Sequence, residues 1–256
     1  MKGFARIAAA LVLLAGCSGY SGVPPLTAGP FAAAPHPLVV SGSDFKRIAV
    51  WGSKGSTAVA QCPHGYRIVA GGSSSSDGST VGTGYANFSL NSWVVKPDSS
   101  ATAEAFATCV SRAARAAFRW RSAGPVSGIA AAQCPPDFVL VTGFGQGTIK
   151  TSYFNASGNS YWVKGGGNAY ASCARKSAGV VIRHAWNKSQ KPKTVYAGCG
   201  DGYTVIGGAM GNSAWPGPPI QEHPGVSGGP GMHGYNGWWT FSNALNELTW
   251  AACVLQ

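Results

Sequence analysis

The chain has 256 residues and a formal net charge of +11, yet only 11% of its residues are charged and 37 are glycine. This composition excludes a protein of long amphipathic helices, whose exposed faces need many charges, and favours an exported β protein with frequent turns. The excess of positive charge predicts attraction to anionic polymers, such as acidic polysaccharide, lipopolysaccharide, teichoic acid, phospholipid or nucleic acid, or else serves solubility alone.

The first sixteen residues predict an export signal. Lys2 and Arg6 give it a charged start, and residues 7–14 form an apolar run that is too short to span a bilayer. The end of this segment, Leu14-Ala15-Gly16-Cys17, resembles a bacterial lipobox. That resemblance implies cleavage before Cys17, diacylglyceryl transfer to its sulfur, and palmitate among the acyl groups of the anchor; the alternative is an ordinary secretory signal with a chance cysteine. Because Ser18 follows rather than aspartate, we expect the outer membrane in a host that has two.

The rest of the chain predicts a tether and one domain. Residues 17–44 comprise the lipidated cysteine and a segment that is small, proline-rich and almost uncharged, as expected of a tether. Residues 45–256 are long enough for one all-β domain with its own core.

A unit of tryptophan, cysteine, tryptophan and cysteine is written three times in this domain. The units cover about residues 45–111, 112–175 and 176–256, and their landmarks are Trp51, Cys62, Trp93 and Cys109, then Trp120, Cys134, Trp162 and Cys173, then Trp186, Cys199, Trp238 and Cys253. The first cysteine precedes a turn and an alternating strand that reaches a glycine, which predicts a bulge or a close backbone approach. The second cysteine ends a run of alternating small residues, which predicts close packing against another sheet. We expect about four strands per unit, with the tryptophans in the core.

Six of the seven cysteines belong to these units. An exported chain should oxidise them, and of the 15 pairings that six cysteines allow the repeat favours one disulfide per unit. The favoured pairs are Cys62–Cys109, Cys134–Cys173 and Cys199–Cys253. The absence of a Cys-x-x-Cys motif argues against zinc, and no metal or other cofactor is predicted.

These elements predict a pseudo-threefold β-prism of three four-stranded sheets; the alternative is a β-sandwich. The pattern Cys-Pro-x-Gly, Gly-Gly, Trp and Cys resembles repeats of bacterial exported and surface proteins. The three-unit layout is also distantly similar to the vitelline membrane outer layer proteins, which implies a disulfide-rich β-prism over about residues 45–256 and transfers no function.

The third unit differs from the others in a longer segment between its first cysteine and second tryptophan. This segment and its C-terminal end contain aromatic side chains beside an asparagine. Because aromatic faces stack on sugar rings and an amide can form hydrogen bonds with the sugar hydroxyls, the segment predicts a ligand site. The candidate ligand-binding residues are Trp215, Tyr235, Asn236, Trp238 and Trp239. The alternative is a loop that closes one end of the fold and fills it with its aromatic side chains.

Catalytic motifs are scarce. No close pair stands out among the eight acidic residues, and no Gly-x-Ser-x-Gly elbow occurs. We therefore predict a non-enzymatic binding module for carbohydrate or envelope polysaccharide, lectin-like or an adhesin, with no specific binding of nucleic acid. The first alternative is a structural component that docks a protein partner in an envelope or appendage complex. The second is a polysaccharide hydrolase that uses Asp201, Glu222 or Glu247.

Overall fold

The computed structural model describes residues 39–76, 84–97, 100–155, 158–187, 193–212, 221–224, 236–242 and 247–256. These residues belong to a compact unit, Pro37–Gln256. The predicted signal, Cys17 and the tether up to residue 38 lie outside the described residues. In the part of the chain that is described, no helix is long and apolar enough to cross a membrane.

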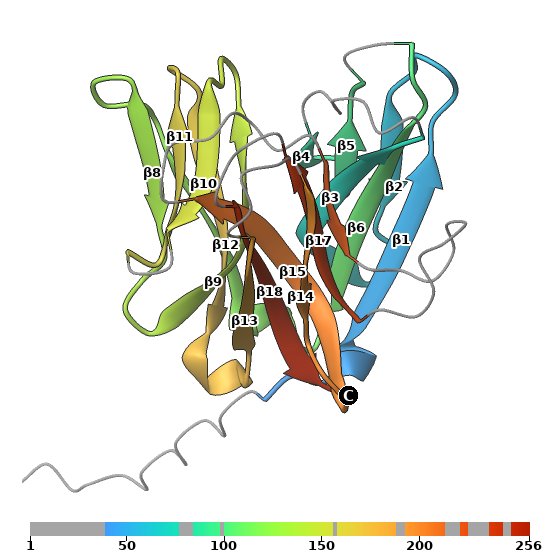
Figure 1. Ribbon diagram of the computed structural model, residues 1–256. Helices are drawn as coiled ribbons and strands as arrows, with labels where there is room; N and C mark the ends of the chain where they lie inside the picture. Colours follow the sequence, from blue (N-terminus) through green and yellow to red (C-terminus); the bar gives the residue numbers. More distant parts are fainter. Residues whose placement is uncertain are drawn as a thin grey trace, which may run out of the picture. The chain divides into compact units, whose positions relative to one another are not determined.

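The prediction of an all-β domain is confirmed (Figure 1). The first repeat contains β1 (Phe45–Trp51), β2 (Ala58–Gln61), β3 (Tyr66–Ser75), β4 (Gly84–Asn87), β5 (Ser92–Val95) and β6 (Ala103–Ser111). The second contains β7 (Phe118–Ala123), β8 (Ile129–Gln133), β9 (Phe138–Gln146), β10 (Thr151–Asn155), β11 (Ser160–Lys164) and β12 (Asn168–Arg175). The third contains β13 (Val181–Asn187), β14 (Lys193–Gly198), β15 (Tyr203–Asn212), β16 (Gln221–Pro224), β17 (Gly237–Ser242) and β18 (Glu247–Leu255). Three short 3-10 turns, η1 (Gly42–Asp44), η2 (Arg115–Ala117) and η3 (Lys176–Ala178), each precede the first strand of a repeat or lie close to it.

Each repeat builds two antiparallel three-stranded layers rather than the single four-stranded sheet that the sequence predicts. The long sheets have the orders β1-β6-β3, β7-β12-β9 and β13-β18-β15, and the short sheets have the orders β2-β5-β4, β8-β11-β10 and β14-β17-β16. Two strands per repeat are additional to the prediction. In the first repeat they are β2 and β4, which are four residues long and therefore too short to show a clear alternation.

The three predicted disulfides are confirmed. Cys62–Cys109, Cys134–Cys173 and Cys199–Cys253 have Cα–Cα separations of 5.7, 5.6 and 5.7 Å. In every repeat the first cysteine directly follows a short-sheet strand and the second lies in the central strand of the long sheet. Each disulfide therefore joins the two layers of one repeat.

The layers are packed closely because one face of each central long strand carries small residues. In β6 these residues are Ala103, Ala105 and Ala107, which are buried against Trp93 of the short sheet. The close backbone approach that we predict at the glycine following the first cysteine of each repeat is also confirmed. A Cβ at Gly71 would overlap the Trp93 ring, and the same conflict arises between Gly143 and Tyr161 and between Gly208 and Trp238.

The buried ring of the second repeat is thus Tyr161, and the sequence alignment of Trp162 with Trp93 and Trp238 is wrong by one residue. The strand register shows the correspondence directly. Tyr161 lies opposite Ala132, as Trp93 lies opposite Ala60. Trp162 is its neighbour along β11, and because adjacent residues of a strand point to opposite faces, Trp162 leaves the interlayer core.

A β-bulge at the same position of β3, β9 and β15 forms the centre of the domain. The register shifts around Val69, Val141 and Ile206, and all three side chains are buried in one cluster. A bulge adds one residue to the strand and turns its side chain out of the alternation. The three strands β3, β9 and β15 contact one another, so this cluster unites the repeats.

The repeats are also neighbours in a ring. One edge strand of each short sheet lies against the bulged strand of the next repeat. These contacts join β4 to β9, β10 to β15 and β16 to β3. Only the last of these contacts includes strand pairing among the described residues, with Glu222 opposite Ser73, and it joins two sheets into one of six strands. Contacts between repeats therefore recur in one direction around the domain.

Candidate functional site

The structure gives two of the predicted ligand residues a structural position. Trp238 is fully buried beneath Gly208 and leaves no ring face open to a sugar. Trp239 is half-buried, and its ring lies 4.6 Å from that of Tyr196. Trp215 and Tyr235 lie outside the described residues.

The remaining candidate, Asn236, is the third copy of a structural asparagine. Its Oδ1 accepts a hydrogen bond from the Val205 backbone N–H at 2.8 Å, and its Nδ2 donates to the Tyr203 carbonyl. Asn91 makes the same pair of bonds to Ile68 and Tyr66, and Asn159 makes them to Leu140 and Phe138. The backbone carbonyl of each asparagine also accepts a hydrogen bond from the backbone N–H of the first cysteine of its repeat. This asparagine clamp ties the short sheet to the start of the bulged strand.

Replacing Asn159 by alanine should lower the free energy of unfolding by about 3 kcal/mol, since two partly buried hydrogen bonds are worth about 1 kcal/mol each and a left-handed backbone costs alanine about 1 kcal/mol more. Asn159 has a φ of 46°. Urea denaturation of the oxidised protein measures the loss. Asn159→Gly is the control, because it removes the same side-chain bonds but adopts the backbone freely, so its loss should be smaller than that of alanine. Equal stability of wild type and both variants would contradict a clamp.

An arginine-rich groove lies between the first and second repeats and is the best candidate for a functional site. It consists of two adjoining hollows of about 420 and 630 Å³ that share Arg67, Ile68, Phe88, Arg115 and Trp120 among their lining residues. The first hollow also contains His64 and Arg112, and the second also contains Arg119 and Arg121. We call this surface, defined by its five arginines with Phe88 and Trp120, the arginine groove.

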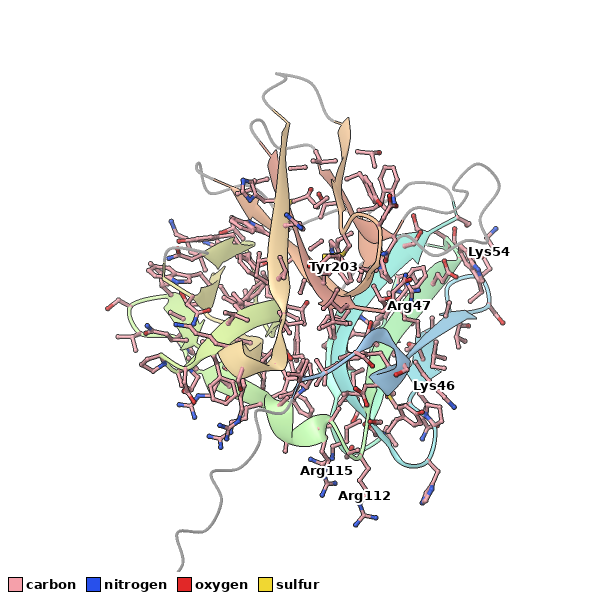
Figure 2. All side chains as sticks on the ribbon, turned by 90° about the horizontal axis from the view of Figure 1, so that it is seen from below. Lys46, Arg47, Lys54, Arg112, Arg115 and Tyr203 are labelled. Atoms are coloured by element: carbon pink, nitrogen blue, oxygen red, sulfur yellow. A yellow bond between two sulfur atoms is a disulfide. The ribbon has the colours of Figure 1, made fainter. Side chains whose placement is uncertain are left out.

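Three segments position the arginines. Arg67 lies on β3, Arg112 and Arg115 lie in the connection from β6 to β7, and Arg119 and Arg121 lie on β7. Figure 2 shows Arg112 and Arg115 side by side, projecting outward from the ribbon. All five side chains are exposed.

The aromatic side chains of the groove rest on the packing between the repeats. The Trp120 Nε1–H donates a hydrogen bond of 3.1 Å to the Ile68 carbonyl across the repeat boundary. The Phe88 ring packs edge-to-face on Trp120, with centroids 5.3 Å apart, and both rings contact Phe144. Phe88 nevertheless keeps 47% of its surface exposed, so the groove presents an open aromatic face held by a rigid core.

In the first repeat, the first tryptophan does not have the core role that the sequence predicts. Trp51 is 51% exposed, and the side chain of Trp186 lies outside the described residues. Cys109 lies opposite Lys46 and Cys173 lies opposite Arg119, so Trp120 corresponds to Arg47 rather than to Trp51. Trp120 is therefore specific to the second repeat, which places the groove at this junction.

The groove is strongly electropositive. Its lining contains no carboxylate, and none of its arginines has a carboxylate within 4.0 Å among the residues that the structure describes. Unpaired guanidinium groups on one surface sum to a positive potential that attracts anions. Arg119 also lies over the ring of Phe138 on β9, 5.2 Å from its centroid.

Two of the predicted catalytic acids do not meet. Asp201 precedes Tyr203 at the start of β15, whereas Glu247 pairs with Asn212 at its end. At roughly 3.3 Å per residue the two ends of this strand are about 30 Å apart, which is too far for a glycosidase pair. The side chains of Glu222 and Glu247 lie outside the described residues. Elsewhere, burial raises the pKa of Glu104 on β6 to about 7, so this carboxyl is partly protonated at neutral pH.

A comparison of the chain with protein-family models and with curated proteins finds no match. The groove itself is therefore the basis for assigning a function. Exposed guanidinium groups around an aromatic face can bind and orient a ligand.

The sequence contained a signal for both the arginine groove and the asparagine clamp. Arg112, Arg115, Arg119 and Arg121 stand within one short segment, and an asparagine two residues before a buried aromatic recurs at Asn91-Ser92-Trp93, Asn159-Ser160-Tyr161 and Asn236-Gly237-Trp238. The arginine cluster could have been found from spacing alone, whereas Arg67 and Phe88 reach the groove only through the fold.

Proposed function

We propose that this protein is a non-enzymatic binding module for polysaccharide, and that its ligand binds in the arginine groove. The observation that carries the proposal is the half-exposed Phe88, supported by Trp120 and surrounded by guanidinium groups. A sugar ring can pack its CH face on such an aromatic face, while arginine N–H groups donate to its oxygens.

The proposal includes an exported and lipid-anchored location. It is supported by the lipobox-like segment Leu14-Ala15-Gly16-Cys17, by the three disulfides and by the proline-rich residues 18–44, which would hold the domain away from the membrane. Ser18 favours the outer membrane of a host with two membranes. We further propose that the ring of repeats is prism-like, which is supported by the contacts among β3, β9 and β15.

Phe88→Ala is expected to weaken polysaccharide binding about tenfold, because loss of one stacked ring removes about 1.4 kcal/mol. The thermal midpoint should change little, since about half of this side chain is already exposed. Retention on a panel of immobilised bacterial and host polysaccharides selects the ligand, and titration calorimetry then compares the variants.

Leu90→Ala is the matched control, because Leu90 is 51% exposed near Phe88 in the connection from β4 to β5 but does not line the groove. An equal loss in both variants would place the binding elsewhere. If the wild type retained no polysaccharide at all, the proposal would be overturned, and docking of a protein partner would become the favoured alternative.

A further inference from the structure

We infer that the ligand of the arginine groove is a polyanionic glycan, whose successive sugar units carry carboxylate or phosphate groups, and that the groove holds at least two charged units at once. This inference rests on the proposed function and names the class of its ligand. Its basis is the hydrogen-bonding character and the two-part shape of the groove.

The polar side chains of the groove are dominated by donors. An arginine has five N–H donors and no acceptor, so it satisfies an anionic oxygen but leaves the hydroxyl hydrogens of a neutral sugar unpaired. The nearest amide, Asn91, uses both of its polar side-chain atoms on β3, and the Ile68 carbonyl accepts the Trp120 indole. A ligand with acceptor-only groups therefore fits this lining better than a neutral sugar does.

The arrangement of the arginines favours several weak contacts acting together. A single exposed ion pair contributes little binding energy, so one guanidinium alone would not hold an anion at physiological salt. Guanidinium groups bind carboxylate or phosphate through two parallel hydrogen bonds, which adds geometric selectivity that a lysine lacks. All five cations of the groove proper are arginines, although the chain contains more lysines than arginines.

The two hollows supply two subsites. Arg67 and Arg115 line both, Arg112 belongs only to the first, and the Arg119–Arg121 pair belongs only to the second. A chain with an anion on every sugar can place one charge in each hollow while Phe88, which lines both, contacts the sugar between them. A singly charged monosaccharide can fill only one hollow. Affinity should therefore rise steeply with chain length until both hollows are occupied and level off afterwards.

Oligogalacturonates of increasing length are suitable probes of this inference, with their methyl esters as neutral counterparts of the same length. A linear glycan of hexose units joined through phosphodiesters tests phosphate in place of carboxylate. Calorimetry with the full chain should show that binding gains at least about tenfold from monomer to tetramer and loses at least about tenfold on esterification, equivalent to about 1.4 kcal/mol in each case. Binding of either the carboxylate or the phosphate polymer supports the inference and identifies the anion.

Variants separate guanidinium recognition from net charge. The double variant Arg67→Lys with Arg115→Lys keeps the charge and should still lose about tenfold in affinity, because the paired hydrogen bonds are lost. Lys54→Ala with Lys150→Ala removes two charges from exposed positions outside the groove and should leave the affinity within about twofold, because neither lysine lines the groove and exposed charges are screened by salt. Circular dichroism melting of each variant establishes that it folds.

Three results would overturn the inference. Equal binding of acid and methyl ester would reject the polyanionic ligand while the proposed polysaccharide-binding function survived. Absence of binding to any saccharide, charged or neutral, would reject both. Equal binding to DNA or to anionic phosphatidylglycerol vesicles, reduced as much by the lysine control variant as by the arginine variant, would mean that the net charge alone was responsible.

Discussion

Replacing Gly143 by alanine is expected to lower the free energy of unfolding by at least about 3 kcal/mol, the upper part of the range for overpacked cores. The added methyl group would overlap the Tyr161 ring, which is buried between the two layers of the second repeat. The ring cannot move aside, because its hydroxyl is hydrogen-bonded to Ser152 at 3.0 Å and its strand pairs on both sides. The layers themselves would have to separate.

Urea denaturation of the oxidised protein measures this loss. Gly124→Ala is the matched control, because Gly124 is exposed and its nearest neighbour to a new Cβ is 3.7 Å away, so the change should stay within about 0.5 kcal/mol. In a Tyr161→Ala background the substitution at Gly143 should cost much less, since the two residues are in contact and their effects are not additive. A loss below about 1 kcal/mol in the wild-type background would contradict the close approach of the layers.

Removal of the disulfide of the second repeat is expected to have a comparable effect. The paired substitution Cys134→Ala with Cys173→Ala should lower the free energy of unfolding by about 4 kcal/mol, because the bond spans a sequence separation of 39 residues and restricts the unfolded chain. It also joins the two layers of the repeat. Loss of the bond should therefore loosen the layers as well as enlarge the unfolded ensemble.

The same measurement on the other two disulfides provides the comparison. Their sequence separations are 47 and 54 residues, and because the entropic cost grows only with the logarithm of loop length, all three double variants should lose nearly the same free energy. Reduction of the wild type with dithiothreitol should destabilise it more than any single pair of substitutions. A double variant as stable as the oxidised wild type would show that the bond does not contribute.

The repeat was predictable because its chemistry is local. Paired cysteines and alternating small residues identified three disulfides and the close packing of two layers, and both are confirmed at Cys109 and its alanine neighbours. Tryptophan positions were less informative. Trp162 lies one residue from the buried position that Tyr161 occupies, and Trp120 matches Arg47 rather than Trp51 in strand register. The core requires an aromatic ring at a given register position, and that ring need not be tryptophan.

Some of the predicted ligand residues occupy structural positions. Of the five ligand residues expected in the third repeat, Asn236 and Trp238 have structural roles, because a clamp and a core ring recur at matching positions in every repeat. Symmetric positions indicate packing, and a functional residue is better sought where one repeat differs from the others. Among the residues that the structure describes, Phe88 and the arginine segment 112–121 have no counterparts of the same kind at the other two junctions.

The sequence by itself determined the all-β class, the threefold repetition and the disulfide pairing, because cysteine spacing and strand alternation depend on neighbours along the chain. Only the tertiary structure decided the six strands per repeat, the burial of the bulge residues Val69, Val141 and Ile206, and the groove. Arg67 and Phe88 meet Arg115 and Trp120 because the second repeat packs against the first. That contact depends on strand register and on the order of the repeats around the domain, which no local pattern encodes.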